Sequence, residues 1–338
     1  MAKDYNVAVV GATGLVGQEF LKIALQRRFP IKELRLLASN RSAGRRVTVG
    51  EWELEVEETN SKSFAGVDIA FFSATTEVSR QIVPAAVKAG AVVIDDSSAW
   101  RMEPDVPLVV PEVNADDLED HKGTISIPNC PTAPLVHTLW PLHTANPIKR
   151  IIVDTYQSVS GHGAKAVQEL TAQTRAVLDG NSATAHVFSH QIAFSLLPHV
   201  GVFLGSGYTK EEWKIINETK KIMHEPDLAI SATCVRVPVY VGHCEAVHVE
   251  FTRPITPEDV NTILRDTPGV TIQDEPSVNL YPTPRGVVGK DDTFVGRIRQ
   301  DASHPMGIAL WIASDNLRKG AALNAIQVAE ELIARRLI

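Results

Sequence analysis

The segment SIPNCPTAPLV, residues 126–136, places a cysteine where a thiolate would be stabilised. Cys130 follows the β-like stretch GTISIP and precedes the helical stretch PLVHTLWPL. Pro131 and Pro134 suit the first turn of a helix, where backbone N–H groups have no intrahelical acceptor. The positive end of a helix dipole favours a thiolate. We therefore expect a reactive cysteine at a strand-to-helix junction, although a lone cysteine is more often an inert core residue.

Other residues with chemical potential stand at the ends of predicted strands. Arg236 lies among valines in CVRVPV, and burying a guanidinium without an anionic partner is costly. His243 follows in the same region and could be either structural or a proton carrier. Gln157 ends another predicted strand, beside the small-residue loop SVSGHG. Arg101 follows a strand of the first half, at the carboxyl edge where doubly wound sheets bind ligands.

A glycine-rich turn near the N-terminus predicts a dinucleotide site. The stretch YNVAVV is typical of a buried strand, GATGLVG of a turn, and QEFLKIAL of a helix. Glycines at this turn let the backbone approach a pyrophosphate at the helix N-terminus, whereas a plain tight turn is the alternative. The residues assigned to the cofactor here are Gly11, Thr13, Gly14, Leu15, Val16 and Gly17.

The choice of dinucleotide depends on the loop after the next strand, LRLLAS. An NAD site usually offers a carboxylate there to the ribose 2′-hydroxyl. This loop instead offers Ser39, Arg41 and Ser42, and a guanidinium flanked by hydroxyls suits a 2′-phosphate. We therefore predict NADP(H) as the cofactor, with a solvated loop arginine as the alternative reading.

The elements that position these residues follow two patterns. Strands and helices alternate through the first part of the chain, which predicts an α/β protein with a Rossmann-type, doubly wound parallel sheet. Beyond Cys130, alternating strands separated by long helices predict a mixed sheet in a second domain. We expect the first domain to cover residues 1–130, completed by a C-terminal helix over 316–338, and the second domain to cover 131–315.

Composition excludes several classes of function. The 338-residue chain carries a net charge of −7, which argues against nucleic-acid and anionic-membrane partners. Three cysteines without a CxxC pattern predict neither a disulfide framework nor a metal site. No apolar stretch is long enough to span a bilayer, and the N-terminus lacks a signal-peptide pattern. We expect a cytoplasmic protein.

The motifs together resemble those of bacterial aspartate-semialdehyde dehydrogenases. In chain order they are GATGLVG, ASNRSAG, DDSSAWR, PNCPT, YQSVSGHGAKA, HQIAFSLLPHVG, TKEEWKIINETKKI, CVRVPV with GHCEAVHVEF, and DNLRKGAALNAIQ. The resemblance implies NADPH-dependent reductive dephosphorylation of β-aspartyl phosphate to aspartate β-semialdehyde and phosphate, in lysine, threonine and methionine synthesis. It also implies a homodimer or homotetramer, with a Rossmann domain and an α/β catalytic and dimerisation domain.

The resemblance assigns a role to each matching position. Cys130 becomes the nucleophile that forms an acyl-enzyme, His243 the general acid/base, and Gln157 the residue that orients the intermediate. Arg236 holds the substrate α-carboxylate, and Glu211 faces its amino group. The phosphate-binding set is Arg101, Asn129 and Lys214, and further cofactor contacts are Ser160, Gly161 and Asn316.

Two positions depart from the family pattern. Pro131 follows the cysteine where the family usually has Ser or Thr, and it removes a backbone donor beside the nucleophile. Cys244 follows His243 where serine is common, which is an exchange of one small residue for another.

Three alternatives remain open. An N-acetyl-γ-glutamyl-phosphate reductase shares the fold and the acyl-phosphate chemistry, but it should have a different cysteine block and no EEWK helix. A catalytically silent NADP-binding paralogue would have little reason to keep both Cys130 and His243. A phosphorylating sugar-phosphate dehydrogenase also uses Cys and His, in blocks of different order and surroundings.

Overall fold

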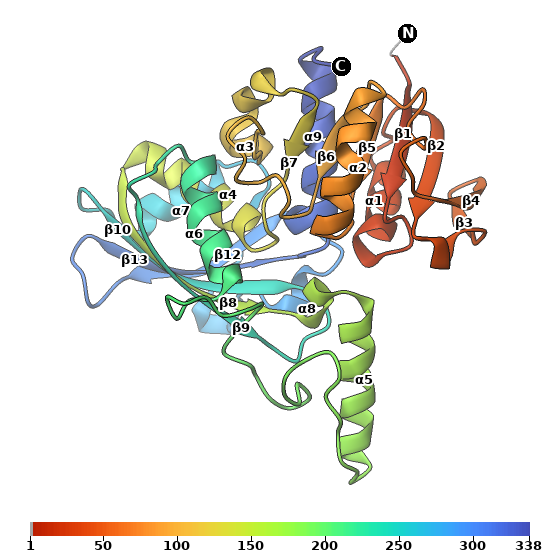
Figure 1. The fold of residues 1–338 in the computed structure, drawn as a ribbon. Coiled ribbons are helices and arrows are strands. Elements are labelled where there is room, and N and C mark those ends of the chain that lie inside the picture. The colour runs from red at the N-terminus through yellow and green to blue at the C-terminus, as the bar shows by residue number, and fades with distance from the viewer. Residues whose placement is uncertain (1–2) are drawn as a thin grey trace. The chain divides into compact units, whose positions relative to one another are not determined.

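The structure, a computed structural model, describes residues 3–338 and divides into two compact units. The first unit contains the chain up to Asn129 together with Ala321–Ile338, and the second contains Cys130–Gly320. Each unit has a central sheet and its own helices (Figure 1).

The sheet of the first unit is largely parallel. In spatial order its strands are β3 (Arg46–Val49), β4 (Trp52–Glu58), β2 (Ile31–Ala38), β1 (Tyr5–Val10), β5 (Ile69–Phe72), β6 (Val92–Asp95) and β7 (Thr124–Ser126). All neighbouring pairs are parallel except β3 and β4, which form an antiparallel hairpin at one edge. The order reverses at β1, and ligands bind at such switch points in doubly wound sheets.

Helices cover both faces of this sheet. They are α1 (Leu15–Gln26), α2 (Thr76–Lys88), the short α3 (Pro111–Asn114) and α9 (Leu323–Ala334), with 3₁₀ turns at Asn40–Ser42 and Ala115–Asp120. Phe20 of α1 and Ile326 of α9 share one buried cluster with Phe71 of β5. Ile82 of α2 packs with Phe72 in a separate cluster on the other face. The last helix of the chain therefore completes the core of the first unit.

The sheet of the second unit is mixed. In spatial order its strands are β11 (Val270–Ile272), β12 (Thr293–Gln300), β13 (Gly307–Ser314), β10 (His243–Phe251), β8 (Ile148–Gln157) and β9 (Ala229–Arg236). The pairs β8–β9 and β11–β12 are parallel, whereas β10 is antiparallel to both of its neighbours.

The two faces of this second sheet differ. Buried and half-buried residues alternate along β8 and β10, so only one face is deeply covered. The covering helices are α4 (Thr132–Ala145), α6 (Lys210–Ile222) and α7 (Pro257–Arg265), and they lie together on one side in Figure 1. Toward the other face lie α5 (Ala164–Leu178), the short α8 (Pro284–Val287) and 3₁₀ turns at Val159–His162 and Pro276–Val278. A π-helical turn, Arg318–Ala322, leads into α9.

The predicted fold class, an α/β protein with one Rossmann-type and one mixed sheet, is confirmed. The β3–β4 hairpin was not part of the prediction, although Trp52, Leu54 and Val56 alternate with glutamates in β4, as they would in a half-exposed strand. The C-terminal helix is shorter than the predicted 316–338, since α9 begins only at Leu323, after the π-helical turn.

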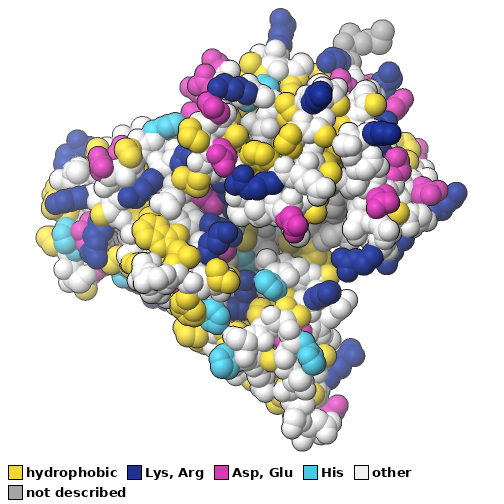
Figure 2. Space-filling view, viewed as in Figure 1, with side chains coloured by type: hydrophobic (Ala, Val, Ile, Leu, Met, Phe, Trp, Pro, Cys, Tyr) yellow, Lys and Arg dark blue, Asp and Glu magenta, His cyan; other side chains and the backbone are white. Residues whose placement is uncertain are grey.

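The surface mixes charges of both signs. On the face shown in Figure 2, basic and acidic side chains intermingle, with hydrophobic side chains in small groups between them. Within residues 3–338, no helix is both long and apolar enough to cross a membrane.

Candidate active site

Three strand ends bring the predicted catalytic residues of the second unit together. Gln157 and Arg236 are the last residues of the parallel strands β8 and β9, and they are partners in the ladder. His243 is the first residue of β10, which runs antiparallel to β8 from the same edge. Because parallel strands end where the antiparallel strand begins, residues far apart in sequence converge at one sheet edge.

Cys130 and His243 are in direct contact. Sγ of Cys130, just before α4, lies 3.3 Å from Nε2 of His243. The histidine is 1% exposed, and burial lowers its pKa to about 3, with the neighbouring charge of Arg236 acting in the same direction and Glu211 opposing it. A half-buried thiol beside a neutral imidazole is an arrangement suited to nucleophilic catalysis.

Two residues of α6 extend this group. Oε1 of Glu211 accepts a hydrogen bond of 3.1 Å from Nε2 of Gln157, and Oε2 pairs with Lys214 at 2.9 Å. A capping box between Thr209 and Glu212 fixes the start of α6, and Glu212 also accepts a bond from the backbone of β9. The helix is therefore held with Glu211 directed at the strand ends.

Arg236 is a buried cation whose guanidinium can still bind an anion. It is 4% exposed, and its Nη1 donates to the backbone oxygen of Ser158 at 2.6 Å. Burial lowers its pKa, and the nearby Glu211 opposes that shift. Among residues 3–338 it forms no ion pair, so a ligand carboxylate could complete its coordination.

A buried polar network, which the sequence reading did not predict, lies behind the histidine. Ser158 donates its backbone N–H to Nδ1 of His243 over 3.1 Å, and its hydroxyl lies 3.0 Å from the same nitrogen. Oδ1 of Asn316 accepts a bond from the amide of Gly242, and the hydroxyls of Ser158 and Ser160 lie 3.1 and 3.3 Å from the same oxygen. Asn316, expected as a cofactor contact, thus uses its amide to hold this loop.

Two glycines allow the close approach of these segments. A Cβ atom at Gly161 would lie 3.1 Å from Nε2 of His243 and 3.3 Å from Nη1 of Arg236. One at Gly320 would lie 2.9 Å from the backbone oxygen of Cys130. A side chain at either position would press on Cys130, Arg236 or His243, so the sequence SGHG has to satisfy a packing requirement as well as form a turn.

The first unit contains the glycine-rich loop in the predicted setting. The loop joins β1 to α1, and Gly11 has a φ of 82° with its Cα facing the backbone of Ser73. A Cβ at Gly17 would lie 2.3 Å from the oxygen of Gly11, so only glycine lets α1 start this close. Gly14 is the N-cap of α1 and offers no side-chain cap, which leaves the first amide groups of the helix available to a phosphate. Thr13 belongs to the same turn, and Leu15 and Val16 are the first residues of α1.

The loop after β2 lies beside this turn. Oγ1 of Thr13 is 3.3 Å from Oγ of Ser42, so the two segments form one surface. Ser39 precedes the 3₁₀ turn Asn40–Ser42, which presents Arg41 as an exposed side chain.

Arg101 and Asn129, both predicted phosphate ligands, belong to the first unit and are buried. Nη2 of Arg101 donates to the backbone oxygen of Asp96 at 2.6 Å, and this bond holds the guanidinium at the carboxyl end of β6. Arg101 therefore lies at an edge where a doubly wound sheet binds ligands.

The other two cysteines are poor nucleophiles. Cys234 and Cys244 are buried within β9 and β10, and burial raises the pKa of both thiols well above the ordinary value. Within residues 3–338, no group of three His, Cys, Asp or Glu side chains is placed to hold a metal ion.

Comparison with known proteins agrees with these two units. Residues 6–121 match the family described as semialdehyde dehydrogenase, NAD binding domain, and residues 139–319 match semialdehyde dehydrogenase, dimerisation domain. Aspartate-semialdehyde dehydrogenases from Aquifex aeolicus and Bacillus subtilis are each 50% identical to the chain, with 99% and 98%, respectively, of both sequences covered. The chain belongs to the aspartate-semialdehyde dehydrogenase family.

Solved structures of the family have the same fold. Aspartate semialdehyde dehydrogenase II from Vibrio cholerae, complexed with ASA, is 44% identical and has a TM-score of 0.96, covering 98% of this chain and 99% of that one. The enzyme from Candida albicans with NADP is 28% identical and has a TM-score of 0.77, covering 99% and 100%.

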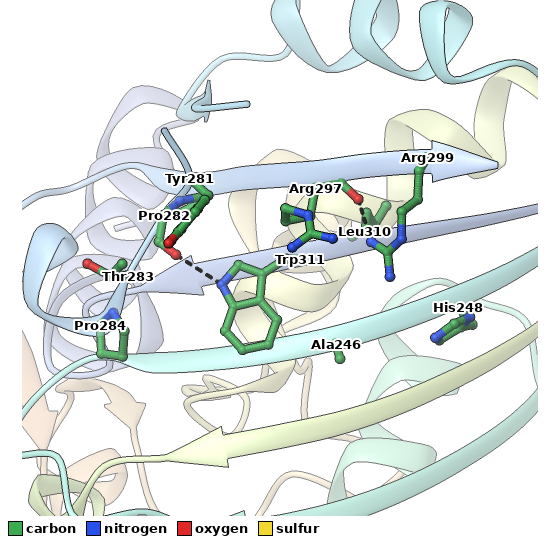
Figure 3. A pocket seen from close by; sticks show the side chains of 10 residues that line it. All are labelled: Ala246, His248, Tyr281, Pro282, Thr283, Pro284, Arg297, Arg299, Leu310 and Trp311. Carbon is green, nitrogen blue, oxygen red and sulfur yellow. Dashed lines mark hydrogen bonds between the residues drawn. The ribbon is translucent and has the colours of Figure 1, made fainter. Parts of the chain in front are cut away.

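A separate pocket opens on the less covered face of the second sheet. It has a volume of about 310 Å³ and is lined by side chains that include Ala246, His248, Arg299 and Trp311. In Figure 3 the indole of Trp311 lies among the labelled side chains of the pocket and donates to the backbone oxygen of Pro282. The predicted site residues do not line it, so this pocket is separate from the Cys130–His243 pair.

Proposed function

We propose that the protein catalyses the NADPH-dependent reductive dephosphorylation of β-aspartyl phosphate to aspartate β-semialdehyde and phosphate. The observation that carries the proposal is the contact of 3.3 Å between Cys130 and His243, with Arg236 and Glu211 acting on the same imidazole. Membership of the family supports the substrate, since the relatives bear the name of this aldehyde.

The chemistry follows from the properties of a thiolate. Cys130 attacks the carbonyl carbon of the acyl phosphate, a C–S bond forms, and the C–O bond to phosphate breaks. The product is a thioester on Cys130. His243 lies against the sulfur, where it moves the proton when the reduced intermediate collapses, and Gln157 orients the acyl group from the end of β8.

Substrate recognition needs one cation and one anion at fixed positions. Arg236 binds the α-carboxylate, for which it has free coordination in a buried setting. Glu211, already held by Gln157 and Lys214, faces the α-amino group. Lys214, Arg101 and Asn129 bind the phosphate group of the substrate. The two cations among them attract this anion locally, although the net charge of the whole protein is negative.

The first unit is suited to hold NADP(H). The uncapped N-terminus of α1 and the loop Gly11–Gly17 fit a pyrophosphate, while Ser39, Arg41 and Ser42 fit the 2′-phosphate. The dinucleotide, when bound, supplies the hydride that reduces the thioester.

A direct assay tests the proposal. The purified protein should reduce NADP when given aspartate semialdehyde and phosphate together, and it should not do so when phosphate is left out. N-acetylglutamate semialdehyde, tested in parallel, should be a much poorer substrate. Preference for the acetylated aldehyde would assign the chain to the reductase instead.

Preference for NADP should depend on Arg41. Arg41→Ala should weaken NADP binding about ten- to a hundred-fold, because a charge-assisted hydrogen bond contributes roughly 1.5–3 kcal/mol. NAD binding should stay unchanged, and Arg265→Ala, which removes an exposed arginine at the end of α7, should affect neither cofactor. Titration by dinucleotide fluorescence measures both affinities. Equal affinities of the unmodified protein for NAD and NADP would contradict the assignment.

We also propose a homodimer or homotetramer, in which a second copy covers the less covered face of the second sheet. The match to a dimerisation domain at residues 139–319 and the half-buried apolar residues on that face support this. Exposed Phe194, Leu196, Val202 and Phe203 extend the apolar surface of the same unit.

A charge placed on that face should prevent assembly. Ala246→Arg introduces a large cation opposite Trp311, and we expect it to shift the protein toward the monomer in sedimentation velocity. Glu51→Arg, at the exposed turn of the β3–β4 hairpin, is the matched control and should leave the assembly intact. A wild-type protein that sediments as a monomer would refute the proposed interface.

A further inference from the structure

Ser158 lies against Nδ1 of His243 with both its backbone N–H and its hydroxyl. Its backbone nitrogen lies 3.1 Å from Nδ1, and its hydroxyl oxygen lies 3.0 Å away. A backbone amide can only donate, so Nδ1 must keep its lone pair in this arrangement. The neutral ring then carries its proton on Nε2, the nitrogen that lies 3.3 Å from Sγ of Cys130.

The surrounding network has a consistent direction. The amide of Gly242 donates to Oδ1 of Asn316 at 2.9 Å, which fixes the orientation of that side-chain amide. Nδ2 of Asn316 therefore donates to Oγ of Ser160 at 3.0 Å. Ser160 lies 3.1 Å from the Ser158 hydroxyl, so it can donate there while Ser158 donates to Nδ1. The donors then run in one direction toward the imidazole.

The surroundings of the ring also favour the neutral imidazole. Cys130, Arg236 at the end of β9 and Glu211 on α6 are the titratable groups that act on His243. Burial and the Arg236 cation both lower the pKa of the imidazole, and Glu211 and the backbone of Gly242 only partly oppose them. Donors aimed at Nδ1 add to this effect because a second proton on the ring would displace them.

We infer that Ser158 is a positioning residue that holds His243 with its proton on Nε2, so that the neutral imidazole donates a hydrogen bond to the Cys130 sulfur. The inference deepens the proposed function and rests on it, because it specifies the state in which the acid/base residue enters the reaction. When Cys130 ionises, the S–H bond breaks, the electron pair stays on sulfur, and the proton passes to water. The half-buried position of Cys130 allows that exchange.

Nitrogen NMR of the unmodified enzyme tests the tautomer directly. With ¹⁵N-labelled histidine, the His243 signals are those lost in His243→Gln. We expect an unprotonated Nδ1 and a protonated Nε2 between pH 6 and 8. A proton on Nδ1, or an imidazolium at pH 7, overturns the inference. This measurement needs no substrate, so it stays informative whatever reaction the enzyme catalyses.

Ser158→Ala tests the contribution of the hydroxyl. It should lower kcat about three- to ten-fold with little change in KM, the effect of one lost hydrogen bond. Iodoacetamide labelling of Cys130 should follow one ionisation in the wild type, whereas the variant should show a second ionisation on the acid side.

The control for this variant is Ser314→Ala. Ser314 is buried opposite His243 in the β10–β13 ladder, and within residues 3–338 its hydroxyl has no hydrogen-bond partner. The same chemical deletion there should leave kcat and the labelling profile unchanged. Identical pH profiles for the two variants would overturn the role of Ser158. An active Cys130→Ala enzyme would instead refute the proposed function and leave the tautomer result standing.

Discussion

Replacement of Cys130 by alanine is expected to abolish turnover of aspartate semialdehyde, with a loss of about 1,000-fold or more, while NADP binding is retained. The loss is large because covalent catalysis has no substitute when the nucleophile is deleted. The cofactor loop belongs to the first unit, whereas Cys130 belongs to the second, so the dinucleotide affinity should not change. Steady-state kinetics and a fluorescence titration of NADP measure the two effects.

The other thiols serve as controls. Cys234→Ala and Cys244→Ser should remain active, since burial raises the pKa of both thiols and, among residues 3–338, no hydrogen bond joins either sulfur to His243. Mass spectrometry of enzyme quenched with β-aspartyl phosphate, without NADPH, should find the acyl adduct on Cys130. An adduct on either of the other cysteines would remove the basis of the mechanism.

The second large effect concerns stability. Glu245 lies on β10 with both carboxyl oxygens buried, and within residues 3–338 neither oxygen has a hydrogen-bond partner. Burial raises the pKa of this carboxyl well above its ordinary value of 4.5. The folded state therefore keeps a proton that the unfolded state releases, and this contribution to stability is full below pH 4.5 and is lost as pH rises toward the folded-state pKa.

Glu245→Gln removes that dependence. The free energy of unfolding of the variant, relative to the wild type, should increase with pH above 4.5 by up to about 1.4 kcal/mol per pH unit. Urea denaturation at pH 5, 6, 7 and 8 measures the difference. Glu51→Gln, at an exposed turn, should show no such trend. A difference that is constant across this range would show that the carboxyl of Glu245 is ionised in the folded protein.

Local sequence signals predicted the sites that rest on local geometry. The run GATGLVG could be interpreted because a strand precedes it and a helix follows it, and the glycines are needed for close packing between them. Cys130 was predictable because the prolines beside it mark the start of α4. The convergence of Gln157, Arg236 and His243 came instead from resemblance, because strand order cannot be derived from three separate segments.

Ser158 and Glu245 show two different limits of prediction from the sequence. Part of the contact of Ser158 with His243 comes from its backbone N–H, and any residue type can provide one, so the serine gave no clear signal. Glu245, by contrast, had a signal: in HCEAVHVEF the period of two places it on the same face as Val247 and Val249. A carboxylate in phase with buried valines indicates an unusual protonation state, and only the depth of its burial required the structure.

The return of the chain to the first unit sets an order for folding during synthesis. The second unit is one continuous stretch, Cys130–Gly320, whereas α9, which covers one face of the first sheet, is made last. At ribosomal rates, on the order of ten to forty seconds separate the emergence of Asn129 and Ala321. Throughout that interval the nascent first unit exposes the apolar surface around Phe20 and Phe71, which makes it a natural client for chaperones until the final helix arrives.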